Sequence, residues 1–282
     1  MALVVDDHHR DNLAEFAQAV DKVISSHDDS RVAFDCEGVN LSRVGTVELV
    51  AICFEEPVCE KTTVFLVDLN NEKQTRNLQE RVATLKRLLE SPDTVKVIHD
   101  CRMDSDVLYH KHGIRLQNVH DTSCFHAIQK GTTQTSLNDM LLYNGVPQNN
   151  VREKSIYKQN PRYWATRPIT NQMIEWSSSD VDKLLSVASK QTLSVKSRGK
   201  YKEAMGASSA YAAFARDMNI ETGVVCLCHV GGFIGRRGAN IQSVQNRTGT
   251  LVYSEHTANK FMIYYRDRAS LNAVKRAMGH SV

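Results

Sequence analysis

The order of short apolar runs and amphipathic segments constrains the fold of this chain most strongly. Three β-rich runs follow one another without a helix between them: 31–36, 46–54 and 63–69. Further along, strand-like runs alternate with segments of helical periodicity: strands at 94–100 and 116–121, and helices at 75–90, 102–112, 122–130 and 136–144. Helices at 12–26 and 170–190 flank this region, the second one capped by Thr170. Strands that come first alone and then alternate with helices predict an α/β domain with a mixed sheet.

Charge divides the chain into an acidic body and a basic tail. Residues 1–190 carry 22 Lys and Arg against 27 Asp and Glu, whereas residues 219–282 carry eight against three. Residues 191–218 are polar, basic and helix-compatible, and we expect them to form a connector between the two parts. A basic tail favours a polyanionic partner, although a solvated basic face has the same composition.

The composition is that of an ordinary intracellular protein. Hydrophobic residues make up 41% and charged residues 24% of the 282 positions. No apolar stretch approaches the ~20 residues of a membrane span, and the start of the chain lacks the pattern of a secretory signal. Seven cysteines without a C-x-x-C pair predict reduced thiols. We therefore expect no membrane partner and a place in the cytoplasm, the nucleus or an organelle.

Two acids close the first β-rich run, in "VAFDCEGVN" at residues 32–40. Because residues i and i+2 of a strand point to the same side, Asp35 and Glu37 should share one face and repel each other unless a proton or cation intervenes. Asp104 begins the helix after "VIHDCRM", and Asp180 lies beside the apolar face of the last helix. Converging carboxylates suit Mg²⁺ or Mn²⁺, while each acid taken singly is also typical of a helix cap or a surface charge.

Three motifs resemble those of the DEDD 3′–5′ exonucleases, most closely the RNase D and Egalitarian-like branch. They are Asp35-x-Glu37, "VIHDCRMDSDVLYHKHGI" and "WATRPITNQMIEWSSSDVDKLL", and the likeness covers roughly residues 10–190. It implies an RNase H-like fold and makes four acids the ligands of two divalent cations: Asp35, Glu37, Asp104 and Asp180. Asp100 and Asp106 would then be cap and surface charges. His99 and Asp121 remain either site residues or packing and turn residues.

One position departs from this family. Its members usually place a tyrosine four residues before the last Asp, or a histidine five before it, to orient and deprotonate the attacking water. Trp176 and Glu175 stand there in this chain. Trp has no lone pair that accepts a proton, and losing general-base assistance lowers a rate by about 10² to 10⁴. Reduced or absent hydrolysis therefore stays an open alternative.

Residues 224–253, "VVCLCHVGGFIGRRGANIQSVQNRTGTLVY", resemble a type I KH domain, a small α+β fold. The resemblance implies that single-stranded RNA binds along a G-x-x-G turn and its flanking apolar residues: Ile234, Gly235, Arg236, Arg237, Gly238 and Ile241. Glycines let the backbone approach phosphates, and arginines add charge. A degenerate KH fold that contacts proteins is the other interpretation.

The sequence thus predicts a 3′–5′ exonuclease domain over 1–190, a connector over 191–218 and a KH domain over 219–282. The expected activity is hydrolysis of single-stranded RNA ends by two Mg²⁺ or Mn²⁺ ions, which stabilise the attacking and leaving oxygens. Two rivals remain. One is a non-catalytic RNA-binding adaptor, and the other is DNA 3′-end trimming.

Overall fold

A six-stranded mixed sheet forms the centre of the first of two units in this computed structural model, which describes residues 1–26, 30–55, 58–59, 61–70, 77–131, 135–153, 155–255 and 259–282. Unit 1 spans Met1–Arg216 and unit 2 spans Asp217–Val282. The strands of unit 1 lie in the order β1-β4-β3-β2-β5-β6. Strand pairs β1·β4, β2·β5 and β5·β6 are parallel, and β2·β3 and β3·β4 are antiparallel. The predicted α/β fold with a mixed sheet is confirmed.

The elements of unit 1 follow the chain in this order: β1 Ala2–Val5, α1 Arg10–Ser25, β2 Arg31–Glu37, β3 Leu49–Phe54, β4 Thr63–Asp68, α2 Leu78–Leu89, β5 Val95–Ile98, α3 Arg102–His112, β6 Val119–Asp121, α4 Thr122–Lys130, α5 Leu137–Tyr143, α6 Ile156–Gln159, η1 Tyr163–Ala165, α7 Asn171–Val181, α8 Leu184–Lys196 and α9 Tyr201–Phe214. Residues 75 and 76, where the second helix was expected to begin, lie outside the described residues. No helix within the described residues is long and apolar enough to cross a membrane.

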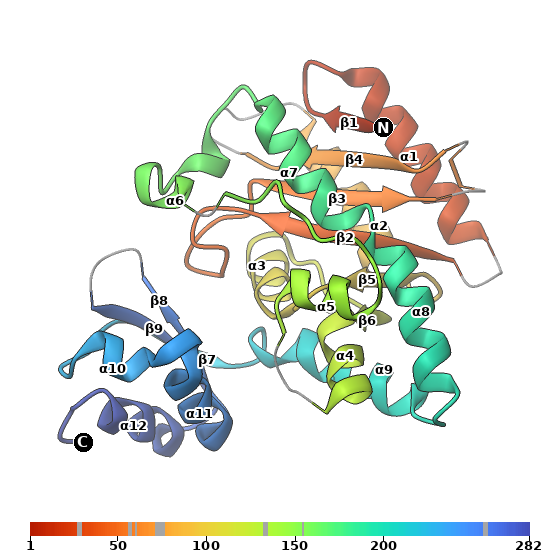
Figure 1. Ribbon diagram of the computed structural model, residues 1–282. Coiled ribbons are helices and arrows are strands. Elements are labelled where there is room, and N and C mark those ends of the chain that lie inside the picture. Colours follow the sequence, from red (N-terminus) through yellow and green to blue (C-terminus); the bar gives the residue numbers. More distant parts are fainter. Residues whose placement is uncertain are drawn as a thin grey trace. The chain divides into compact units, whose positions relative to one another are not determined.

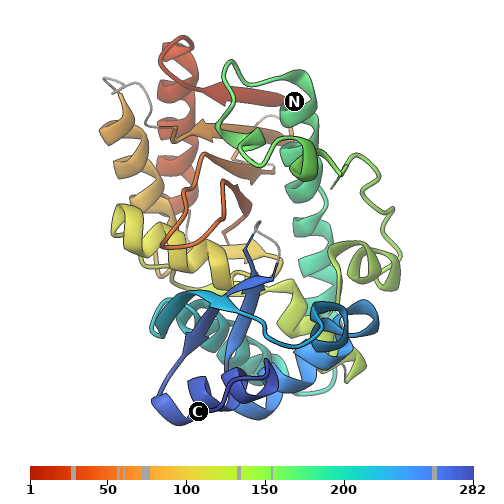
Figure 2. The same ribbon diagram turned by 90° about the vertical axis from the view of Figure 1, so that its left-hand side faces the viewer.

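Helices cover both faces of the sheet, and strand β2 contributes to both layers (Figures 1 and 2). Phe34 and Cys36 belong to the core beneath α1, α2 and α3. Ala33 belongs to the opposite core, which α5, α7 and α8 close. Because side chains alternate along a strand, Asp35 and Glu37 follow Ala33 onto the face that α7 covers.

The predicted helix over 170–190 is in fact two helices. Thr170 caps α7 as expected, because its Oγ1 accepts a hydrogen bond from the Met173 N–H at 3.2 Å. The chain then turns at Asp182 and Lys183, where ψ is −22° and −12°, before α8 begins. The break places Asp180 in the last turn of α7, beside strand β2.

The stretch expected as a connector, 191–218, mostly belongs to unit 1 in the structure. Its first residues complete α8, and its centre forms α9, which packs against β6, α3 and α4. Small buried side chains at Ala204, Ser208 and Ala212 recur every four residues, so the helix backbone approaches its neighbours closely. The unit boundary falls between residues 216 and 217.

Unit 2 is a three-stranded antiparallel sheet, in the order β7-β9-β8, packed against helices. Its elements are β7 Asn219–Val225, α10 Val230–Ile234, η2 Arg236–Gly238, α11 Ala239–Thr248, β8 Leu251–Ser254, β9 Lys260–Tyr265 and α12 Arg268–Ala277. Its own core includes Phe233, Phe261, Leu271 and Val274. The chain order β-α-α-β-β-α follows directly from these bounds.

Candidate metal centre

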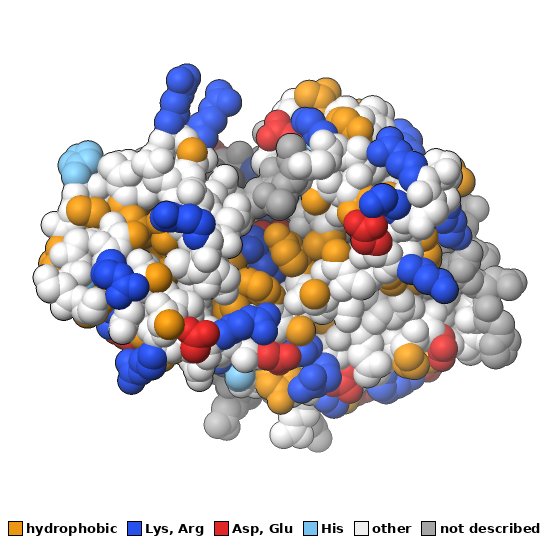
Figure 3. Space-filling model, turned by 90° about the horizontal axis from the view of Figure 1, so that it is seen from below, with side chains coloured by type: hydrophobic (Ala, Val, Ile, Leu, Met, Phe, Trp, Pro, Cys, Tyr) orange, Lys and Arg blue, Asp and Glu red, His pale blue; other side chains and the backbone are white. Residues whose placement is uncertain are grey.

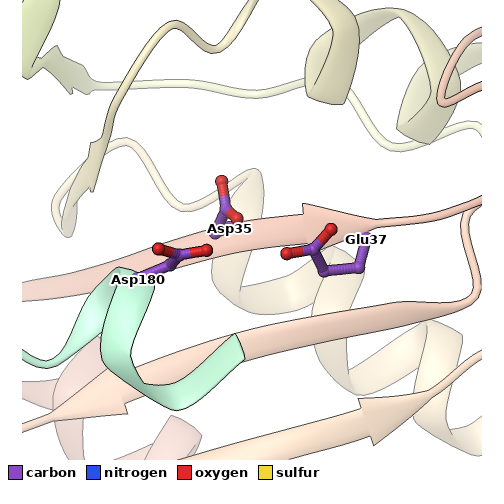
Figure 4. Close-up of side chains that lie close together, drawn as sticks. All are labelled: Asp35, Glu37 and Asp180. Carbon is purple, nitrogen blue, oxygen red and sulfur yellow. The ribbon is translucent and has the colours of Figure 1, made fainter. Parts of the chain in front are cut away.

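Three carboxylates predicted from separate motifs converge above strand β2. Asp35 and Glu37 come from the end of β2, and Asp180 comes from the last turn of α7 (Figure 4). One oxygen from each lies within 4.8 Å of the others. All three side chains stand on the sheet face covered by α7, so the geometry agrees with the alternation along β2.

The fourth predicted acid, Asp104, reaches β2 from the other side. Strand β5 pairs with β2 only as far as Ala33, so the N–H of Cys36 has no strand partner there. Asp104 Oδ1 accepts this N–H at 3.1 Å from the first turn of α3. Its negative charge is the largest electrostatic contribution, after burial, to the raised pKa of Asp35. Asp104 therefore belongs to the same electrostatic cluster, although its oxygens lie outside the group of three.

Burial and mutual repulsion favour the protonated forms of these acids. Burial, followed by the charges of Asp104, Glu37 and Asp180, raises the pKa of Asp35 well above its usual value. The pKa of Glu37 rises for the same reasons, and burial raises that of Asp104 to about 7. Four carboxylates held this closely need protons or a cation to balance them.

The donor set fits a divalent cation of the Mg²⁺ or Mn²⁺ type. Every ligand available is a carboxylate oxygen, which hard cations prefer. Glu37 Oε1 is buried and has no hydrogen-bond partner among the described residues. Buried polar atoms nearly always have a partner, so an oxygen left open towards two other carboxylates indicates a position where a ligand is expected.

The other acids in and just after the second motif have structural contacts. Asp100 pairs with Arg102, and Asp121 caps α4 by accepting from the N–H groups of Ser123 and Cys124. The expectation that Asp106 is a surface charge is wrong: its side chain is fully buried and accepts three bonds from Arg43. This pair of a half-buried guanidinium and a buried carboxylate fixes the loop that follows Glu37.

His99 also has structural partners. Its Nδ1 lies 2.9 Å from Thr122 Oγ1, and its Nε2 lies 3.2 Å from the Thr135 carbonyl oxygen. Both ring nitrogens are therefore engaged at the start of α4 and before α5. Of the two alternatives left open for His99, these contacts favour the packing role.

Sequence reasoning missed two residues that hold Asp180. Asn149 donates from Nδ2 to Asp180 Oδ1 at 2.5 Å, and Arg152 Nε lies 3.0 Å from Oδ2. Both belong to the irregular segment before α6, where no periodicity singles out a residue. The pKa of Asp180 is raised by burial, and the Arg152 charge partly opposes this rise.

Trp176 and Glu175 point in different directions from α7. Trp176 is 1% exposed and packs edge-on against Trp164, with ring centres 5.5 Å apart. Burial raises the pKa of Asp180, and the nearby Trp176 side chain partly opposes this rise. Glu175 is exposed and lines an open groove of about 510 Å³ together with Asn171 and Asp182. Trp176 therefore faces the acids, and Glu175 faces solvent.

In unit 2, the G-x-x-G turn lies between α10 and α11. Gly235 has a φ of 74°, and a Cβ there would lie 2.9 Å from the backbone N of Asn240, so no side chain fits. Arg236 and Arg237 are exposed at the tip, and Ile234 and Ile241 pack half-buried against the core of unit 2. On the face of the molecule in Figure 3, Lys and Arg side chains are more widespread than Asp and Glu.

Comparison with known proteins gives one family and several relatives. The family model described as 3′-5′ exonuclease matches residues 9–196. The piRNA biogenesis protein EXD1 of Bombyx mori is 41% identical over 78 residues, which cover 25% of this chain and 25% of that protein. The matched stretch thus spans a quarter of the length of this curated relative.

Solved structures share the fold at low identity. Escherichia coli RNase D, an exoribonuclease involved in structured RNA processing, has a TM-score of 0.55 and 21% identity over 76% of this chain and 49% of that chain. Brucella melitensis NrnC bound to pGG has a TM-score of 0.51 and 20% identity over 67% of this chain and 85% of that chain. The same protein with bound Mg²⁺ has a TM-score of 0.52, 19% identity and the same coverage.

Proposed function

Because the chain belongs to the 3′–5′ exonuclease family, we propose that it is a metal-dependent 3′–5′ exoribonuclease that removes nucleotides from single-stranded RNA ends. The observation that carries this proposal is the convergence of Asp35, Glu37 and Asp180 within 4.8 Å. RNA rather than DNA is favoured by the relatives, which include an exoribonuclease and a piRNA biogenesis protein.

The four acids would hold the cations: Asp35, Glu37, Asp104 and Asp180. Bound divalent ions supply charge stabilisation for the attacking and leaving oxygens of phosphodiester hydrolysis. The protein orients these ligands. The Cys36 N–H fixes Asp104, and Asn149 fixes Asp180. Trp176, one turn before Asp180 on α7, is buried against Tyr163 and Trp164.

We further propose that unit 2 is a KH domain that binds the RNA strand. Its β-α-α-β-β-α order and its G-x-x-G turn between two helices support this assignment. Two exposed arginines at the turn suit backbone phosphates, and the half-buried Ile234 and Ile241 suit unstacked bases.

The second candidate function is an RNA-binding adaptor without activity. Trp176, at the place where the family usually carries a base, is the observation that favours it. Both functions use the same turn in unit 2, and they differ in whether the acid cluster turns over substrate.

A cleavage assay separates these functions. Single-stranded RNA and DNA labelled at the 5′ end would be incubated with the protein and Mn²⁺, Mg²⁺ or EDTA. Exoribonuclease activity gives a ladder that shortens from the 3′ end of RNA, needs the cation and disappears in Asp35→Asn. RNA retention without a ladder supports the adaptor. A ladder that survives in EDTA or in Asp35→Asn would contradict the metal site.

A further inference from the structure

Asp180 has two side-chain partners that come from one short segment, residues 149–152. Asn149 binds Oδ1 at 2.5 Å, and Arg152 lies 3.0 Å from Oδ2. Asn149 is 2% exposed, whereas the Arg152 side chain is 31% exposed. Each oxygen of this carboxylate thus has a partner of its own, and only one of the two partners is charged.

The segment is fixed to helix α5 and cannot shift freely. Asn138 Oδ1 accepts from the Asn149 N–H at 2.8 Å, and Asn138 Nδ2 donates to the Asn149 carbonyl at 2.9 Å. Asn149 Oδ1 in turn accepts from the Val151 N–H at 3.0 Å. Because these bonds set the backbone on both sides of Asn149, they aim its amide at Asp180 and place Arg152 three residues further along.

The charge of Arg152 acts on three of the four acids, Asp35, Glu37 and Asp180. Besides lowering the pKa of Asp180, it opposes the rise in the pKa of Glu37 and of Asp35. A guanidinium has the same sign as a divalent cation, so the two compete for the same carboxylates. Unlike Asn149, the Arg152 side chain is partly exposed, so it can move towards solvent when a cation takes its place beside Asp180.

We propose that Arg152 is a resident counter-ion of the acid cluster, which a divalent cation must displace from Asp180, and that Asn149 is the positioning residue that orients Asp180 for this cation. The inference rests on the proposed metal site and adds what sets its affinity. Removing Arg152 should strengthen cation binding, and removing Asn149 should weaken it. If the segment had only a structural role, both substitutions would change the affinity for the cation in the same direction.

The test is a calorimetric titration of Mn²⁺ into the full chain without RNA. Arg152→Gln should bind Mn²⁺ about tenfold more tightly than the parent, because a competing charge is gone. Asn149→Ala should bind about 10- to 100-fold more weakly, as is usual when a residue that orients a ligand is removed. Arg152→Lys keeps the charge and should stay near the parent value. Arg162→Gln removes the same charge from an exposed position between α6 and η1, and it serves as the control.

The titrations distinguish failure of the counter-ion role from failure of the metal site. Thermal unfolding of every variant establishes that it is folded before titration. Unchanged or weaker Mn²⁺ binding by folded Arg152→Gln would overturn the counter-ion role while leaving the metal site intact. If the parent and all variants failed to bind Mn²⁺, the proposed metal site itself would be overturned, and the counter-ion role with it.

Discussion

Asp35 is the residue at which the repulsion between the carboxylates of the site can be measured directly. Without a cation, its half-buried carboxylate is repelled by Asp104 and Glu37. Asp35→Asn removes one charge at constant size, so the metal-free protein should become more stable. We expect unfolding in EDTA to shift upward by about 2–4 °C, the shift that ~1 kcal/mol gives in a chain of this size, while Mn²⁺ binding is abolished.

The same substitution should show a defined pH dependence. A carboxyl whose pKa is higher in the folded state binds more protons when folded, so its contribution to stability falls as pH rises above about 4, its value in the unfolded chain. Asp104, with a pKa of about 7, extends this range to neutral pH. The gain from Asp35→Asn should therefore be larger at pH 7.5 than at pH 5. Glu175→Gln, an equal charge change at an exposed position, should show no such trend. If the gain in stability from Asp35→Asn were the same at both pH values, charge repulsion at Asp35 would be contradicted.

Substitution of Trp176 tests whether the lack of a general base at this position limits the rate of cleavage. Its indole N–H can donate a hydrogen bond, but the ring cannot accept a proton. Trp176→Tyr introduces an oxygen that can accept one, so we expect cleavage to accelerate by about 10²-fold, at some loss of stability because the smaller ring leaves a cavity against Trp164. Glu175→Gln should leave the rate unchanged, since Glu175 faces solvent. Rates would be compared in single-turnover assays, and a near-total loss in Glu175→Gln would make Glu175 the base.

At the scale of elements, the turn between α10 and α11 carries the prediction for RNA binding. Arg236→Asp with Arg237→Asp should weaken binding to single-stranded RNA and reduce the slope of log affinity against log salt by about 0.7 for each phosphate that the protein no longer neutralises. Cleavage of very short oligonucleotides should stay nearly unchanged. Arg268→Asp with Arg276→Asp on α12 makes the same charge change elsewhere in unit 2. RNA affinity would be measured by fluorescence anisotropy. If both pairs of substitutions weakened RNA binding equally, the turn would contribute only through the overall positive charge of unit 2.

Elements with a strong period were predictable, and those without one were not. Strand β2 is the short apolar run, and helix α2 has the apolar stripe, that the sequence displays. Strand β1 has only four residues, and α9 buries Ala204, Ser208 and Ala212, which form no apolar stripe. Periodicity measures side-chain hydrophobicity, so a helix that packs through small side chains escapes it.

The candidate site divides in the same way. Spacing placed Asp35 and Glu37 on one face of β2, and family resemblance supplied Asp104 and Asp180. Neither source could reveal Asn149 or Arg152, because the fold of an irregular segment is set by contacts distant in sequence. The burial of Asp106 was missed for a related reason: its partner, Arg43, lies 63 residues away.

For the whole molecule, α9 decides where the first unit ends. Ser208 Oγ accepts the Asp121 N–H at 3.0 Å, and Ser105 Oγ donates to the Ala212 carbonyl at 2.5 Å. Arg43 donates to the carbonyl groups of Ala215 and Arg216. The helix and the two residues after it therefore complete the hydrogen bonding of β6, α3 and the loop after Glu37. A boundary at residue 190 would remove these hydrogen bonds.

Stability of the unit should consequently depend on α9. A fragment of residues 1–216 should unfold cooperatively in urea, with a midpoint near that of the same unit in the full chain, whereas a fragment of residues 1–190 should not fold. Within the full chain, Ala212→Glu should destabilise the first unit by about 3 kcal/mol, because it forces a charge into a buried position. Ala210→Glu, on the exposed side of the same helix, should change stability little. If the two substitutions had equal effects, or if residues 1–190 folded as stably as residues 1–216, α9 would be a connector after all.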